Sequence, residues 1–317
     1  MRILLIDADS KIPNIALMKL STYHKNLGDM VDFIRLDGKV FEYKDTHDIA
    51  YSSIIFTKNK DNIKGNVTLG GTGISLETEL PEEAEHLFPD YSLYPDNQYS
   101  IGYLTRGCCR DCSFCVVPKK EGLIQLYAYP NEFVDKKLPL VRILDNNLLA
   151  YHGWKDLLKE IKEINKPIKF ENFDFKLLTE EMILELFKIR KDSRLNFALD
   201  NPKDIPLYEK KMWLIDKYFR PWTAKFYILS AFDTTLEEDI KRIKFCMEHK
   251  ILPYLIRHEK YLNGEHVDFF NALASWCNQP NMVKTKTFEQ FMNIKFKQGH
   301  PRIKQHVELF NYLWNKI

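Results

Sequence analysis

The sequence predicts an α/β protein in three parts: a small βαβ domain at 1–98, a longer series of strand–helix units at 99–260 and a helical extension at 261–317. Short β-branched or aromatic runs alternate with longer amphipathic segments, which indicates parallel strands joined by helices. A stretch rich in Gly, Pro and acidic residues, 65–97, separates the first two parts and is typical of a linker. The third part carries helical patterns.

Composition narrows the class of protein. The chain has 317 residues, 45% of them hydrophobic, and 46 basic against 44 acidic residues give a net charge of +2. It is long enough for a large core and lacks the charge excess of a nucleic-acid coat. It has no apolar run of about 18 residues and no signal-peptide pattern at its start, so we expect no membrane partner and a cytoplasmic location. Thiols stay reduced there.

The first part opens with a βαβ pattern. The strand "RILLID" at 2–7 precedes a helical pattern from Ile12 to Gly28, and "VDFIRL" at 31–36 and "SSIIFT" at 52–57 read as further strands. Gly28 is a credible residue for the end of the helix, since glycine readily adopts the left-handed conformation found there.

The second part contains six strand patterns separated by helical patterns. Six units are fewer than the eight of a closed (β/α)8 barrel, so we expect a partial (β/α)6 barrel of TIM type, open on one side or completed by another element. The strand bodies are apolar and the residues after them polar, which predicts a catalytic rim at the carboxyl ends of the strands. The six patterns are "SIGYLTR" (100–106), "LVRILD" (140–145), "PIKFEN" (167–172), "RLNFALD" (194–200), "KFYILSA" (225–231) and "ILPYLIR" (251–257).

Four of the six cysteines lie in the loop after the first of these strands. Cys108, Cys112 and Cys115 form a C-x3-C-x2-C pattern, with the aromatic Phe114 before the last cysteine. Three thiolates at this spacing can bind three irons of a cubane cluster and leave the fourth iron open. Cys109 would then have to point away. The alternative is a structural zinc site, but that needs a fourth Cys or His at matched spacing, and none follows in the loop.

The two remaining cysteines, Cys246 and Cys277, fall within helical patterns. For these we expect buried and unreactive thiols.

The cysteine loop at the end of the first strand of a six-unit series resembles the radical S-adenosylmethionine (SAM) superfamily. The resemblance rests on "CCRDCSFC" and covers approximately residues 98–260. It implies a [4Fe–4S] cluster whose open iron binds SAM. Reductive cleavage of SAM then releases a 5′-deoxyadenosyl radical. It also implies an electron donor such as flavodoxin or ferredoxin as a partner.

Other superfamily motifs carry over only in part. The glycine-rich motif after the second strand is replaced by Asp145, Asn146 and Asn147, whose oxygens would accept from the ammonium group of SAM. Each residue at a strand end could instead cap the following helix. The cofactor-binding residues that the resemblance implies are Phe114, Asp145, Asn146, Asn147, Asp200, Asn201 and Ser230.

The first part resembles the N-terminal domains of radical enzymes that bind cobalamin or transfer methylthio groups. Cobalamin requires a histidine in the loop after the first strand, where this chain has "DADSKIPN". The methylthio transferases hold a second cluster on three further cysteines, and no cysteine precedes Cys108. They also carry a C-terminal RNA-binding barrel, where this chain has helical patterns. We therefore expect a cobalamin-domain-like fold without cobalamin, and a nucleic-acid substrate is not favoured.

Polar residues of the first part are candidates for substrate binding. Asp7 and Asp9, with Ser10 and Asn14 just beyond, follow the first strand, and Gly71 lies in the glycine-rich "GGTGIS". Carboxylates at the mouth of the barrel would suit a cationic or polyhydroxylated small molecule. The alternatives are a helix cap and an ordinary turn.

Within the superfamily the chain most resembles the queuine lyases, in its length, its opening "LLIDADSKIPNIALMK" and its lack of cobalamin or auxiliary-cluster ligands. That resemblance implies cleavage of the C–N bond between the cyclopentenediol and the aminomethyl-deazaguanine of free queuine. Tyr227 and Phe232 near strand ends would bind a flat base. The catalytic candidates are Tyr254, Arg257 and His258, of which His258 would manage the proton on the departing amine.

Two other functions remain open on the sequence alone. One is a radical SAM enzyme that modifies a nucleic acid or a peptide. The other is a metal-binding module without enzymatic activity.

Overall fold

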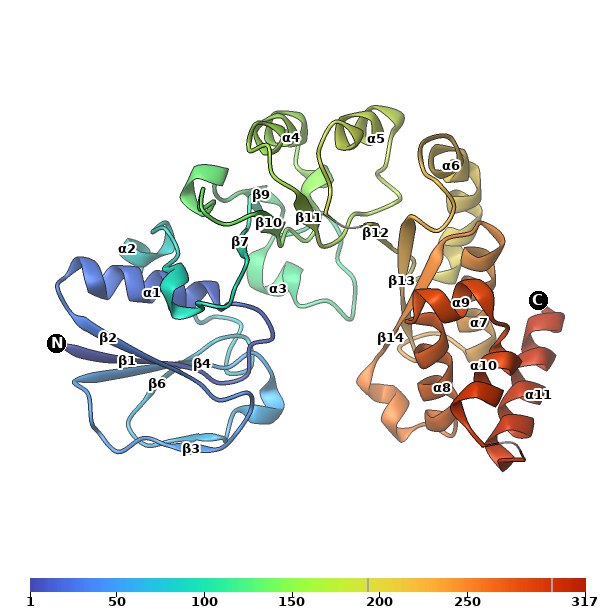
Figure 1. Ribbon diagram of the computed structural model, residues 1–317, viewed down its shortest axis with the longest axis horizontal. Helices are drawn as coiled ribbons and strands as arrows, with labels where there is room; N and C mark the ends of the chain where they lie inside the picture. Colours follow the sequence, from blue (N-terminus) through green and yellow to red (C-terminus); the bar gives the residue numbers. More distant parts are fainter. Residues whose placement is uncertain (193, 298) are drawn as a thin grey trace. The chain divides into compact units, whose positions relative to one another are not determined.

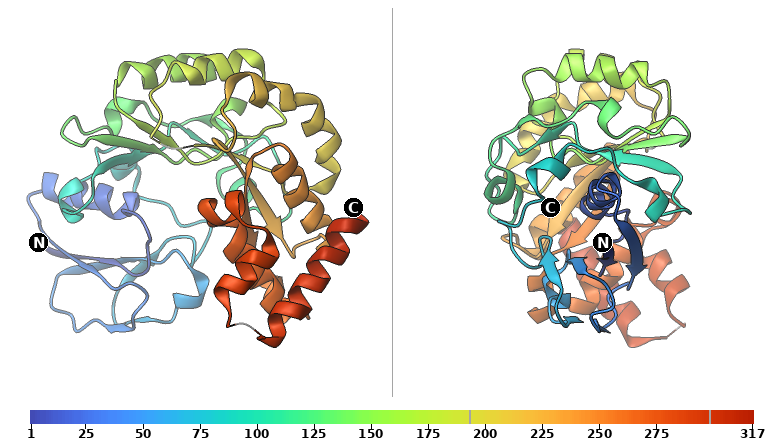
Figure 2. Two further views of the ribbon diagram at one scale, coloured as in Figure 1. Left: turned by 45° about the vertical axis from the view of Figure 1, so that its right-hand side comes forward. Right: turned by 90° about the vertical axis from the view of Figure 1, so that its left-hand side faces the viewer.

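The computed structural model describes residues 1–192, 194–297 and 299–317, which divide into two compact units, 1–169 and 170–317. Figures 1 and 2 show the course of the chain through each. The first unit contains the N-terminal domain and the first two strands of the predicted barrel, and the third of these strands ends one residue beyond it. The domain boundaries expected near residues 98 and 260 stay predictions. Among the described helices, none is both long enough and apolar enough to cross a bilayer.

A four-stranded parallel sheet forms the N-terminal part of the first unit, in the order β2-β1-β4-β6. Helix α1 covers one face of the sheet, and the short parallel pair β3 and β5 lies on the other side (Figure 1). The elements are β1 (Arg2–Asp7), α1 (Ile15–Asn26), β2 (Met30–Arg35), β3 (Phe41–Glu42), β4 (Ile49–Ser53), β5 (Ile63–Lys64), β6 (Thr68–Gly70) and α2 (Glu82–Glu85).

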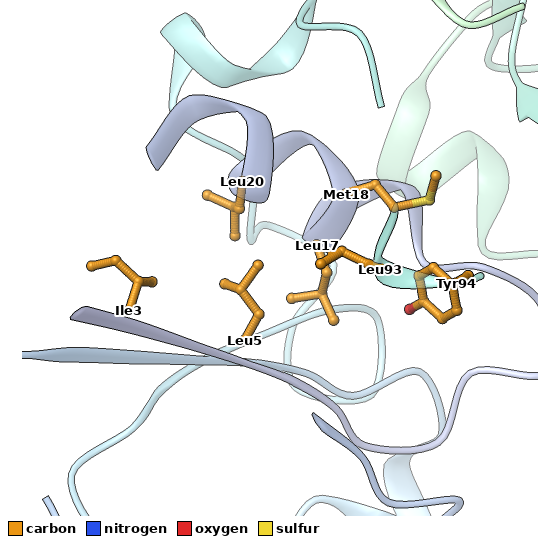
Figure 3. Close-up of a cluster of buried hydrophobic side chains, with 7 residues drawn as sticks. All are labelled: Ile3, Leu5, Leu17, Met18, Leu20, Leu93 and Tyr94. Carbon is orange, nitrogen blue, oxygen red and sulfur yellow. The ribbon is translucent and has the colours of Figure 1, made fainter. Parts of the chain in front are cut away.

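Strand β1 is buried on both faces, which explains its continuous apolar run. Ile3 and Leu5 point toward α1, where Leu17 and Tyr94 complete the cluster in Figure 3. The alternate residues Leu4 and Ile6 belong to a second cluster with residues of β4 and β5. This period of two follows from the pleat of the strand.

The N-terminal domain confirms the βαβ opening with two differences. The third strand lies at Ile49–Ser53 rather than 52–57, because its ladder runs from Ile49 opposite Ile3 to Ser53 opposite Asp7. The predicted linker contributes the edge strand β6, whose three residues are too few to give a recognisable sequence pattern.

All six strands predicted for the second part are present. Three form the parallel sheet β11-β10-β7, and three form the parallel sheet β12-β13-β14. The described residues form no closed barrel, and the partial barrel remains a prediction. The elements of the first unit are β7 (Tyr99–Gly102), β8 (Thr105–Arg106), α3 (Val117–Glu121), β9 (Gln125–Leu126), β10 (Leu140–Ile143), α4 (Trp154–Glu163) and β11 (Ile168–Phe170).

In the second unit, helices alternate with strands and then continue alone. Trp276, Phe288 and Phe310 pack together in the helical extension, with ring centroids 4.7–5.7 Å apart. The elements are α5 (Glu180–Phe187), β12 (Leu195–Ala198), α6 (Ile205–Tyr218), β13 (Ala224–Ser230), α7 (Leu236–Glu248), β14 (Leu252–Arg257), α8 (Val267–Cys277), α9 (Pro280–Thr285), α10 (Phe288–Lys295) and α11 (Pro301–Lys316).

Candidate metal centre

The cysteine loop begins where Asp145 pulls the chain out of its sheet. The carboxylate of Asp145, just after β10, accepts hydrogen bonds from the backbone N–H groups of Leu104 and Thr105, both at 2.7 Å. It also accepts one from the Thr105 hydroxyl at 2.5 Å. These N–H groups are therefore unavailable to the ladder with β10. The strand predicted over 100–106 is interrupted after Gly102 and resumes as the short β8, which pairs antiparallel with β9.

Burial raises the pKa of the Asp145 carboxyl group to about 6, although its hydrogen bonds with Thr105 and Leu104 favour the charged form. The side chain is 4% exposed. This buried carboxylate, with its three hydrogen bonds, fixes the backbone at the start of the cysteine loop.

Glu121 and Gly107 fix the other end of the loop. Glu121 accepts from the Gly107 N–H at 2.8 Å and pairs with Arg106 at 2.8 Å. Gly107 has a φ of +86°, and a Cβ there would lie 2.3 Å from the carbonyl oxygen of Leu123. Only glycine fits this position. The Cys108 N–H donates to the carbonyl of Gly122 at 3.1 Å, so both strands of the loop are tied together before the first ligand.

The sulfur of Cys108 accepts two N–H groups. The backbone N–H of Arg110 lies 3.4 Å from it, and the side-chain amide nitrogen of Asn147 lies 3.8 Å from it. The same amide nitrogen lies 3.6 Å from the sulfur of Cys109. One amide group therefore reaches both sulfurs, and the expectation that Cys109 points away from the cluster stays a prediction.

Cys112 and Cys115 lie in a turn of the same loop. The Cys115 N–H donates to the carbonyl of Cys112 at 2.9 Å, and both side chains are partly buried. Phe114 between them is 37% exposed. No group of three or more Cys, His, Asp or Glu side chains in the described chain is arranged as a finished metal site.

The chemistry of the loop nevertheless fits an iron–sulfur cluster. Thiolate ligands of such clusters are stabilised by N–H donors, and Cys108 has two. Asn147 is 2% exposed, and its side-chain oxygen is buried without a hydrogen-bond partner in the described structure. This buried oxygen beside the cysteines could accept a hydrogen bond from an N–H or O–H group of a bound ligand.

The other two residues after β10 are already engaged. Asp145 holds the loop, and the Asn146 side-chain amide donates to Glu121 at 3.1 Å. Of the three residues expected to replace the glycine-rich motif, Asn147 is the one whose amide donates to the sulfurs of Cys108 and Cys109. No sequence signal distinguished it from its neighbours.

The polar residues after β1 lie together but bind one another and their own domain. Asp7 accepts from the Ser10 N–H at 2.9 Å and from the Tyr94 hydroxyl at 2.8 Å. Asn14 caps α1 and donates to Ser10 at 2.9 Å. This matches the helix-cap alternative.

Asp9 and Gly71 also serve contacts within the N-terminal domain. Asp9 accepts from the N–H groups of Ile55 and Phe56 at 2.8 and 3.0 Å and from the Asn59 amide at 2.8 Å. Gly71, with a φ of +94°, approaches the backbone of Ile54. Gly71 therefore lies against its own domain, and the predicted approach of a substrate to this glycine stays a prediction.

In the second unit, a buried ion pair organises the ends of β12 and β13. Arg242 of α7 is fully buried, pairs with Asp239, and donates to the carbonyls of Leu199 and Asp200 at 3.1 and 2.6 Å. Burial raises the pKa of Asp239, opposed by the charge of Arg242. This ion pair was not among the residues predicted from the sequence. The sequence indicates it only by an acidic residue and an arginine three positions apart on one helix.

The predicted cofactor residues of the second unit lie next to that pair. Asp200 accepts from the Leu229 N–H at 3.0 Å, and burial raises its pKa. Asn201 caps the short helical turn that follows, through the Lys203 N–H at 3.0 Å. Ser230 at the end of β13 donates to the carbonyl of Ile256 at 3.2 Å.

Four of the residues predicted to contact substrate form two aromatic contacts, one within β13 and β14 and one just after them. Tyr227 and Tyr254 meet edge to face with centroids 5.2 Å apart. Phe232 and His258 do so at 4.7 Å. Arg257 donates to the Asn271 side chain. Tyr227 and Tyr254 lie opposite each other within β13 and β14, whereas Arg257 ends β14, and Phe232 and His258 come just after the two strands.

The two cysteines in helices are buried, as expected. Cys246 is 0% and Cys277 is 1% exposed. Burial raises the pKa of both thiols, which disfavours the reactive thiolate.

The chain is similar to three enzymes named tRNA-2-methylthio-N(6)-dimethylallyladenosine synthase. It is 25% identical to that of Aquifex aeolicus over 166 residues, which cover 50% of this chain and 33% of the relative. It is 29% identical to that of Wolbachia pipientis over 144 residues and 26% identical to that of Rickettsia bellii over 137 residues. These cover 42% and 41% of this chain and 28% and 27% of the relatives.

No family model and no solved structure matches the chain. The chain spans a third or less of the length of these curated relatives. They are radical SAM enzymes, and their similarity supports the superfamily expected from the cysteine loop and an enzymatic role. Enzymes of this type use a [4Fe–4S] cluster and SAM, so the prediction of both cofactors is confirmed.

Proposed function

We propose that this chain is a radical SAM enzyme whose cluster is held by Cys108, Cys112 and Cys115. The observation that carries the proposal is the C-x3-C-x2-C loop directly after a parallel strand, with two N–H donors on its first sulfur. The similarity to radical SAM synthases supports it independently.

When bound, the cluster supplies the electron that cleaves SAM to methionine and a 5′-deoxyadenosyl radical. The chain's own residues hold and orient the reactants. Asp145 and Glu121 keep the loop in place, and the orphan oxygen of Asn147 accepts an N–H of the bound ligand. A small electron-transfer protein such as flavodoxin or ferredoxin provides the reducing electron.

For the substrate, we propose free queuine and cleavage of its cyclopentenediol C–N bond. Two features support a small molecule of this kind: no cysteine before Cys108 is available for a second cluster, and the aromatic pair Phe232 and His258 just after β13 and β14 suits a flat base. Tyr227, Phe232, Tyr254 and Arg257 would hold the base, and His258 would donate a proton to the departing amine.

The deciding experiment is anaerobic incubation of the reconstituted chain with SAM, a strong reductant and free queuine, followed by mass spectrometry. We expect 5′-deoxyadenosine together with the aminomethyl-deazaguanine base. Deoxyadenosine with unchanged queuine would overturn the lyase assignment and leave the radical chemistry standing. No deoxyadenosine with any substrate would overturn both.

A second candidate is modification of tRNA, because the similar synthases are named for a tRNA product. The same reaction mixture with bulk tRNA in place of queuine tests it. A mass increase in a tRNA nucleoside would favour this candidate.

The third candidate, a metal-binding module without activity, differs in its metal. About four irons per chain after anaerobic reconstitution support the cluster, whereas one zinc per chain supports a structural module.

A further inference from the structure

We propose that Asn147 is a positioning residue for the cluster: its side-chain amide donates to the ligating sulfur of Cys108 and raises the reduction potential of the cluster. The inference rests on the proposed function, since it requires the cluster at this loop.

The geometry singles out one amide group. Its nitrogen carries two N–H bonds and lies 3.8 Å from the sulfur of Cys108 and 3.6 Å from that of Cys109. The backbone N–H of Arg110 adds a second donor to Cys108 at 3.4 Å. The sulfur of Cys108 thus accepts from one main-chain donor and one side-chain donor, and the side-chain donor can be removed by mutation.

Asn147 is held so that its amide cannot turn to solvent. It is 2% exposed and precedes the buried pair Leu148 and Leu149, which are 1% and 2% exposed. Two residues earlier, Asp145 anchors the same turn through three hydrogen bonds to Leu104 and Thr105. The amide is therefore fixed before any cluster is bound.

Hydrogen bonds to cluster sulfurs favour the reduced state. Reduction adds a negative charge that is shared by the cluster and its thiolates, and a fixed N–H dipole stabilises that charge. Because the donor, Asn147, is itself buried, its dipole is screened less by solvent than a surface donor would be. Removing the donor should therefore lower the potential and make reduction harder.

The neighbouring asparagine provides a matched control. The amide of Asn146 donates to Glu121 at 3.1 Å instead of to a sulfur. A variant at Asn146 disturbs the same turn and the contact with Glu121, but leaves both N–H donors of Cys108 in place.

The experiment compares the reconstituted wild type with Asn147→Leu, Asn147→Asp and Asn146→Leu. Iron is counted in each, and the cluster potential is measured by anaerobic redox titration followed by electron paramagnetic resonance. For Asn147→Leu we expect about a tenfold weaker one-electron reduction equilibrium, which is a fall of about 59 mV. Asn147→Asp should fall further because it adds a negative charge. Asn146→Leu should match the wild type.

An unchanged potential in Asn147→Leu would overturn the inference, as would an equal fall in Asn146→Leu. If Asn147→Leu binds no iron, the nearly isosteric Asn147→Asp decides by its potential. Loss of iron from both would also overturn the inference, because the amide would then serve assembly and not the potential. A wild type that binds no cluster would overturn the proposed function as well, whereas a bound cluster with insensitive potential would leave that function intact.

Discussion

Two polar groups at strand ends look alike in the sequence and differ in the structure. The first follows β1 and contains Asp7, Asp9 and Asn14. The second follows β10 and contains Asp145 and Asn147. In the first group, the carboxylates and the amide form hydrogen bonds within their own domain and stabilise it. In the second, Asp145 has the same structural duty, but Asn147 keeps a buried oxygen without a partner beside two cysteines.

The difference shows how a candidate binding residue is distinguished from a structural one. A polar side chain at a strand end is equally consistent with a helix cap and with a ligand site until its hydrogen-bond partners are known. The buried side-chain oxygen of Asn147, which has no hydrogen-bond partner in the described structure, is the feature that separates Asn147 from Asp7 and Asp9.

The largest effect should come from the cysteine loop. Replacing Cys112 with alanine removes one of three cluster ligands, so we expect loss of the cluster absorption and of SAM cleavage, with the fold retained. Iron analysis and circular dichroism measure both. The control is Cys246→Ala in α7, where the thiol is fully buried and should be irrelevant to iron. Equal iron in wild type and Cys112→Ala would contradict the assignment.

The first polar group should affect stability and leave the cluster alone. Asp9→Ala removes the acceptor of two backbone N–H groups, those of Ile55 and Phe56, and should cost about 4 kcal/mol of unfolding free energy. Urea denaturation measures the loss. Asp32→Ala, which removes an exposed acid paired with Arg2 and His47, should change stability little. A stable Asp9→Ala protein with weakened substrate binding would instead restore Asp9 as a binding residue.

Asp145 should give the second group a specific pH dependence. Its pKa is about 6 in the folded protein against 3.8 ordinarily, so the folded chain holds this proton more tightly than the unfolded chain. Stability from this group is therefore present at low pH and falls as the pH rises from about 4 to 6, by about 3 kcal/mol in total.

The measurement is the free energy of unfolding of wild type and Asp145→Asn at several pH values between 4 and 8. The amide does not titrate, so the difference between the two proteins should change across that window and become constant above it. Other acids cancel in the difference. Parallel curves would show that Asp145 stays ionised throughout.

The sequence predicted the strands of this fold well because their signal is local. A run such as residues 225–231 is apolar and bounded by polar residues whatever surrounds it, and β13 is found at Ala224–Ser230. The break after Gly102 could not be predicted, because it depends on a carboxylate about forty residues away in the chain. The edge strand β6 escaped notice because three residues carry no period.

The candidate site divides in the same way. The cysteine spacing is a local pattern and was readable, whereas the roles of Asn147 and Arg242 are set by which atoms lie near them in space. The contact between Asn147 and Cys109 could not be predicted for that reason, since the amide belongs to another strand end.

The smallest effect should separate the two readings of Gly71. Gly28 and Gly71 both have positive φ angles, +81° and +94°, so alanine at either pays a conformational cost of about 1–2 kcal/mol. A Cβ at Gly28 meets nothing within 4 Å, whereas one at Gly71 would lie 2.4 Å from the carbonyl oxygen of Ile54. Gly71→Ala should therefore be less stable than Gly28→Ala by about 2 kcal/mol in urea denaturation. If the two variants are equally stable and Gly71→Ala loses affinity for substrate, the loop approaches a ligand and not its own chain.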